Sequence, residues 1–144
     1  MQKFNVLWFE DNIKDFKEVV PILDAHCKKI HRSLLVDHHK HYPDDFDVKL
    51  FEGKYSLAFI DLNLQNGQKG TKIINTLREY GAFIDILLYS NNPGQLIELT
   101  EGKNYVEGVF RHATLKGIEE KMKNVIDQVN YKEIMVIKRH NEPH

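Results

Sequence analysis

A short apolar run, residues 57–60, ends abruptly at the carboxylate of Asp61, and this run most constrains how the chain can fold. Gly53 precedes it and Asn66-Gly67 follows it, so turn residues bound it on both sides. A continuous apolar run of this length indicates a strand that is buried on both faces, as in parallel sheets. Such sheets bind ligands at the carboxyl ends of their strands. Asp61 falls at that end, where it can ligate a metal, accept a phosphoryl group or cap a turn.

Two further apolar runs also end in polar residues. Residues 4–9 lead into Glu10 and Asp11, and residues 84–89 lead into Ser90. If these runs lie beside the Asp61 run in one parallel sheet, three acids and a hydroxyl meet at one edge. Taken alone, Ser90 is better explained as a turn or helix-capping hydroxyl than as a site residue.

Apolar runs alternate with stretches of helical periodicity along the chain. The expected strands are 4–9, 33–37, 55–61, 84–89 and 108–111, and the expected helices are 13–30, 44–51, 71–80, 95–100 and 114–138. This alternation predicts an α/β fold, a parallel sheet covered on both faces. We expect a single domain over residues 1–144, with its core at about 3–138 and a frayed tail at 139–144.

Two details concern the first helix. Asn12 precedes it and can cap its first turn. Pro21 lies inside the helical pattern and is expected to kink or split the helix, because it removes one backbone hydrogen bond.

Composition narrows the classes of function. The 144 residues carry a formal net charge of −1, so no basic excess indicates direct nucleic-acid binding. No apolar run approaches the roughly 20 residues that span a bilayer. Cys27 is the one cysteine, which excludes an intrachain disulfide and favours a reducing cytoplasm. We interpret it as a packing residue of the first helix.

Five of the eight histidines lie between residues 26 and 41. Metal binding by His38, His39 and His41 is one hypothesis, because imidazoles are good zinc and nickel ligands. A solvated loop is the favoured interpretation, since these residues are too close together to form a tetrahedral site by themselves. The glycine-rich motifs of dinucleotide and nucleoside triphosphate sites are absent from the sequence.

The acids at the predicted sheet edge favour phosphoryl chemistry. Oxygen ligands from Glu10, Asp11 and Asp61 suit Mg²⁺, which is usually held by a few carboxylates and water. A carboxylate beside such an ion can attack phosphorus and form an aspartyl phosphate.

The ordered set of Glu10-Asp11, Asp61 and Ser90 resembles the receiver domain of two-component response regulators, over nearly the whole chain. The resemblance implies a doubly wound (βα)5 sheet of flavodoxin-like order. It also implies that Asp61 is the phospho-acceptor and that Glu10 and Asp11 hold Mg²⁺ together with Asp61. The backbone carbonyl of Asn63 would complete the metal shell, and Ser90 would hydrogen-bond the phosphoryl group.

The chain departs from receivers after its fifth strand. Receivers carry a lysine there, usually followed by proline, whereas this chain has Arg111 and His112. Arginine keeps the positive charge and can bind phosphate, but its larger planar head is not equivalent to lysine. The departure leaves the acceptor chemistry intact and calls the usual activation relay into question.

Three functional hypotheses follow. The first is a stand-alone receiver that is phosphorylated by a histidine kinase or phosphotransfer protein and signals through a downstream partner. The second is a receiver-like interaction module that works without phosphorylation, with Ile134, Met135 and Ile137 of the long last helix as a docking or homodimer face. The third is a Mg²⁺-dependent hydrolase, which ranks last because no second acid follows Asp61 closely; whether the protein is an enzyme stays open.

Overall fold

The computed structural model describes residues 1–41, 54–64, 70–79, 84–90, 106–110 and 115–141, and its core is a five-stranded parallel sheet. The strands are β1 (Gln2–Phe9), β2 (Arg32–His39), β3 (Leu57–Asp61), β4 (Asp85–Ser90) and β5 (Val106–Phe110). The helices are α1 (Ile13–Lys29), α2 (Gly70–Glu79), the 3-10 helix η3 (Leu115–Ile118) and α4 (Glu119–Asn141).

The strands lie in the order β2-β1-β3-β4-β5, which confirms the doubly wound, flavodoxin-like arrangement. β1 lies second from one edge and pairs in parallel with the edge strand β2 on one side and with the central strand β3 on the other. The chain order reverses beside β1, so the carboxyl ends of β1 and β3 form the switch point at which such folds bind ligands. The predicted helices 44–51 and 95–100 lie outside the described residues.

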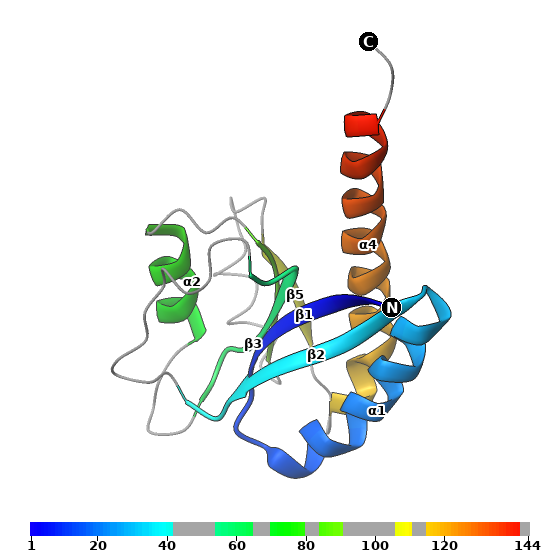
Figure 1. The fold of residues 1–144 in the computed structure, drawn as a ribbon. Helices are drawn as coiled ribbons and strands as arrows, with labels where there is room; N and C mark the ends of the chain where they lie inside the picture. Colours follow the sequence, from blue (N-terminus) through cyan, green and yellow to red (C-terminus); the bar gives the residue numbers. More distant parts are fainter. Residues whose placement is uncertain (42–53, 65–69, 80–83, 91–105, 111–114, 142–144) are drawn as a thin grey trace.

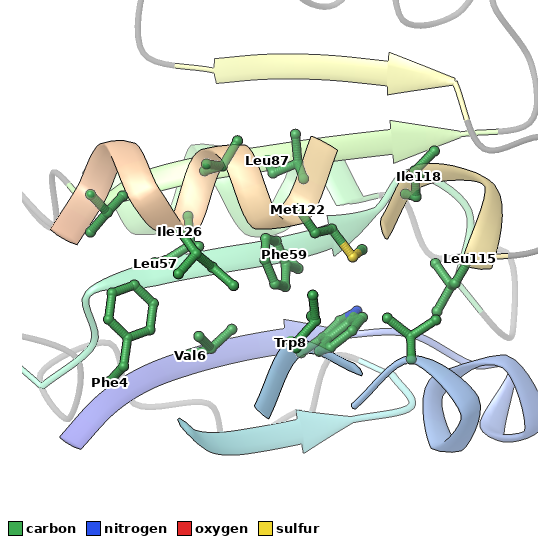
Figure 2. Close-up of a cluster of buried hydrophobic side chains, with 14 of the residues drawn as sticks. Phe4, Val6, Trp8, Leu57, Phe59, Leu87, Leu115, Ile118, Met122 and Ile126 are labelled. Carbon is green, nitrogen blue, oxygen red and sulfur yellow. The ribbon is translucent and has the colours of Figure 1, made fainter. Parts of the chain in front are cut away.

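Helices cover both faces of the sheet, as Figure 1 shows. On one face, Ile73, Ile74 and Leu77 of α2 pack against apolar side chains of the strands. On the other, α1, η3 and α4 share a second cluster with Phe4, Trp8 and other strand residues. In Figure 2, Met122 and Ile126 of α4 lie over the strand residues of this second cluster. Because β3 is buried on both faces throughout, its sequence is continuously apolar up to Asp61.

The first helix follows its sequence signals with one exception. The Asn12 side chain accepts a hydrogen bond from the Asp15 backbone N–H at 3.1 Å, so the predicted cap is confirmed. The expectation that Pro21 could split the helix is wrong, because α1 runs unbroken from Ile13 to Lys29. Pro21 is exposed, so water can solvate the carbonyl that lacks its backbone partner.

The interpretation of His38 and His39 as loop residues is wrong, because both belong to β2. The His38 ring stacks on Phe16 with a centroid distance of 3.8 Å, and the His39 ring stacks on Phe9 at 5.3 Å. Aromatic stacking and the pairing with β1 extend the strand two residues past its predicted end at Asp37. No group of three metal-ligating side chains that includes a histidine occurs among the described residues.

The last helix is longer than the sequence indicated. η3 begins at Leu115, and α4 then continues to Asn141, three residues past the predicted end. The lower half of α4 packs on the sheet, and its upper half extends beyond it (Figure 1). Among the described helices, none is long and apolar enough to span a bilayer.

Candidate functional site

Three carboxylates converge at the carboxyl edge of the sheet. Glu10 and Asp11 follow β1, and Asp61 ends the neighbouring strand β3. One oxygen from each lies within 4.8 Å of the others. Glu10 is fully buried and Asp61 is 3% exposed, whereas Asp11 is partly exposed. The predicted meeting of these acids is therefore observed.

Backbone donors hold the Glu10 carboxylate from one side. Its Oε2 accepts hydrogen bonds from the Asp11 N–H at 3.0 Å and the Asn12 N–H at 3.4 Å. These N–H groups belong to the turn that leads into α1, so the cap that starts the helix also orients the acid. Charge-assisted bonds of this kind stabilise a buried carboxylate.

A tyrosine and a tryptophan hold the same carboxylate from the other side. The Tyr89 hydroxyl donates to Glu10 Oε1 at 3.2 Å and accepts from Trp8 Nε1 at 3.0 Å. Trp8 and Tyr89 are both fully buried, and Trp8 meets Phe16 and Phe59 edge-on. The tightly packed aromatic rings therefore fix the position of the Tyr89 hydroxyl.

Local sequence patterns do not predict this relay, although one signal is present. Tyr89 and Trp8 lie in apolar runs that are typical of buried strands. A buried phenol or indole still needs a hydrogen-bond partner, so each of them indicates a polar group nearby. Neither pattern identifies Glu10 as that group.

His38 adds a third support from the edge strand. Its Nε2 lies 2.7 Å from the carbonyl oxygen of Glu10, and because a carbonyl only accepts, the ring nitrogen donates. The Glu10 N–H in turn donates to the His39 carbonyl at 3.0 Å. Burial is the main cause that lowers the pKa of His38, which favours the neutral ring.

Asp61 is fixed by the end of its own strand. Its Oδ1 accepts from the Asn63 N–H at 3.0 Å, and Asp61 pairs with Tyr89 of β4. Gly70, the first residue of α2, packs directly against it: a Cβ at Gly70 would lie 2.5 Å from the Asp61 carbonyl oxygen. Only glycine fits here, because the contact is with backbone that cannot move aside.

The remaining predicted residues are placed unequally. Ser90 is buried at the end of β4, one residue beyond the ladder partner of Asp61. The Asn63 N–H contacts Asp61, while the predicted metal contact of the Asn63 carbonyl stays a prediction. Arg111 and His112 lie outside the described residues.

The donor set suits a hard divalent cation. All three groups offer oxygen ligands, and carboxylates this close repel one another unless a cation or proton intervenes. The residues present therefore fit a site for a hard divalent cation.

The chain has an α/β fold with a parallel, doubly wound sheet and with acids at the switch point of that sheet. Among solved structures, the fold is similar to the signal receiver domain of a repressor protein from Vibrio parahaemolyticus (TM-score 0.61, 12% identity, 99% of each chain covered). It is also similar to a CheY-like receiver domain protein from Methanospirillum hungatei (TM-score 0.54, 10% identity, 91% of this chain and 99% of that one).

A third similar structure is a response regulator from Burkholderia pseudomallei, solved with a phosphorylated aspartic acid, a calcium ion and citrate (TM-score 0.59, 16% identity, 92% of this chain and 74% of that one). No protein-family model and no curated protein matches the sequence. The fold of this chain is that of response-regulator receiver domains.

Proposed function

We propose that the protein is a receiver that accepts a phosphoryl group on Asp61 with the help of Mg²⁺. The observation that carries the proposal is the convergence of Glu10, Asp11 and Asp61 within 4.8 Å at the switch point of a receiver fold. The phosphorylated aspartic acid and the metal ion in the Burkholderia structure support it by analogy of fold.

The chain's own residues would supply position and charge. The Asn63 N–H orients the Asp61 carboxylate, and an oxygen of that carboxylate attacks phosphorus while the donor's leaving group departs with the electrons of its bond. Mg²⁺, held by the three acids, would neutralise charge on the phosphoryl oxygens. Ser90 would donate its hydroxyl to the phosphoryl group, and Arg111 or His112 would take the role that lysine has in receivers.

In this role a histidine kinase or a phosphotransfer protein donates the phosphoryl group in the cytoplasm. A downstream protein partner then binds the phosphorylated form. Neither step requires nucleic acid or a membrane.

Intact-protein mass after incubation with acetyl phosphate tests the proposal. We expect wild type to gain one phosphoryl group when Mg²⁺ is present and none when EDTA removes it. Asp61→Asn should gain none, and the surface variant Asp24→Asn should behave as wild type does. Equal labelling of Asp61→Asn and wild type would show that Asp61 is not the acceptor.

A second candidate function is a receiver-like module that binds partners without phosphorylation. The exposed apolar residues of α4, Val136 and Ile137 among them, favour it, as does Arg111 where receivers have lysine. Titration with MgCl₂ separates the two functions, with Trp8 emission as the signal because its indole reaches Glu10 through Tyr89. Absence of Mg²⁺ binding at millimolar concentration, by fluorescence and by calorimetry, would favour the module.

A further inference from the structure

A groove lies at the amino edge of the sheet, opposite the acidic site. The first residues of β1 and β2 and the residues just before β3 form its floor, and the outer half of α4 forms one wall. Its volume is about 470 Å³, which lies within the range of ligand-binding clefts. The lining residues are Gln2, Lys3, Asn5, Arg32, Lys54, Tyr55, Ser56, Lys132, Glu133, Val136 and Ile137.

The groove combines apolar contact area with positive charge. Val136 and Ile137 of α4 are 59% and 49% exposed, and the buried Tyr55 lies among the residues before β3. Four lining residues are cationic and one is acidic, although the whole chain carries a formal charge of −1. Positive charge is therefore concentrated at this groove relative to the rest of the molecule.

Polar contacts fix the α4 wall relative to the sheet. Arg32, at the start of β2, donates to Asn130 at 2.9 Å and to Glu133 at 2.7 Å. Lys132 pairs with Asp85 of β4 at 2.9 Å. The groove is thus held open by contacts that do not involve its apolar residues, which leaves those residues available to a ligand.

The cations of the groove differ in whether they already form an ion pair. Arg32 and Lys132 are engaged in ion pairs, which fix structure. The Lys54 ammonium lies 5.7 Å from the centre of the Tyr55 ring, where it remains able to bind an anion. Lys3 is exposed at the start of β1. These two lysines belong to the floor of the groove, whose α4 wall carries the apolar Val136 and Ile137, and they would attract acidic groups.

We infer that this groove is a docking site for a short peptide segment of a partner protein that carries apolar side chains next to acidic ones. The apolar side chains would bury Val136 and Ile137, and the acidic ones would meet Lys3 and Lys54. The inference concerns a face remote from Asp61 and does not depend on its phosphorylation. Apolar anchors with complementary charges at the rim are typical of peptide recognition.

A second copy of the chain is a poorer occupant. The exposed end of α4 that a copy would offer carries Lys138, Arg139 and His140, and these would meet like charge at the groove. An anionic lipid surface is also charge-compatible. It would contact the outward side of α4, including Tyr131 and Ile134, as much as the concave side.

Selection of short random peptides displayed on phage tests the inference. We expect the peptides recovered on wild type to be enriched in acidic and large apolar residues. A recovered peptide should bind Ile137→Glu and Lys54→Glu at least about tenfold more weakly. The first change places an acid against the apolar side chains of the peptide, and the second places one against its acidic side chains. Ile134→Glu is the matched control: it has similar exposure on the same helix but does not line the groove, so affinity should be unchanged.

Three results would overturn the inference. The recovered peptides could lack acidic enrichment, or they could bind the Ile137→Glu and Ile134→Glu variants equally. The third result is binding to vesicles of mixed phosphatidylcholine and phosphatidylglycerol that both variants weaken equally, with no peptide recovered. Urea unfolding of each variant checks that it remains folded, and binding by Asp61→Asn at wild-type affinity keeps this test separate from that of the proposed function.

Discussion

The Tyr89 hydroxyl bonds to both Trp8 and Glu10, so its removal tests the description of the site. Tyr89→Phe deletes two hydrogen bonds and leaves the ring in place. The Trp8 N–H is then a buried donor without that partner, which costs about 1–3 kcal/mol. Loss of a donor to a charged carboxylate adds about 1 kcal/mol or more. We expect the free energy of unfolding to fall by about 2–4 kcal/mol.

Urea unfolding followed by circular dichroism measures this change. With a denaturant slope of about 2 kcal/mol per molar, the midpoint should fall by about 1–2 M. Tyr131→Phe is the matched control, because Tyr131 is 64% exposed and its hydroxyl can bond to water. A fall below about 0.5 kcal/mol for Tyr89→Phe would refute the reasoning, since surface substitutions alone have effects of that size.

The same variant connects stability to the proposed metal. If Glu10 holds Mg²⁺, its orienting partner Tyr89 acts as a positioning residue, and loss of such a partner weakens metal affinity by about tenfold or more. Calorimetric titration with MgCl₂ measures this. A variant that is less stable and yet binds Mg²⁺ as wild type does would remove Glu10 from the metal shell.

Three further outcomes are expected. Gly70→Ala should lower the free energy of unfolding by about 1–3 kcal/mol, because its Cβ would lie 2.5 Å from the Asp61 carbonyl oxygen. Gly117→Ala, at an exposed glycine, should be tolerated, and chemical denaturation compares the two variants. Burial lowers the pKa of His38 in the folded state, so the unfolded chain takes up the proton first as pH falls below about 6.5. The free energy of unfolding should therefore drop between pH 7 and 5, and His38→Gln should flatten that drop. Burial also raises the pKa of Cys27 to about 11, so its thiol should react with a disulfide reagent at pH 8 only as fast as the protein unfolds, and rapid reaction in the folded state would contradict this.

The architecture was largely predictable because strands buried on both faces show as continuous apolar runs. Residues 57–60 are such a run, and the structure places Asp61 at its end as expected. The convergence of the acids follows from parallel pairing, which aligns the carboxyl ends of β1 and β3. Strand order required the receiver resemblance as well, because periodicity alone does not say which strands are neighbours.

Other features depend on contacts between distant residues, which local patterns do not contain. β2 includes His38 because that ring stacks on Phe16, in another element. Tyr89 reaches Glu10 across 79 positions of sequence. The groove beside Ile137 forms where α4 extends past the sheet edge, and the ion pair of Glu133 with Arg32 joins this part of the helix to the start of β2.

Because α4 is long, a small tilt at its packed end would displace its far end by a larger distance. At 1.5 Å per residue its 23 residues span about 35 Å, and the stretch beyond Val129, its last core residue, spans about 18 Å. A tilt of about 10° at the packed end would move the tip by about 3 Å, on the scale of a side-chain contact. The ion pairs of Arg32 and Lys132 would hold the helix near residues 132–133. The groove would therefore change width where those pairs do not hold the helix, at Val136 and Ile137.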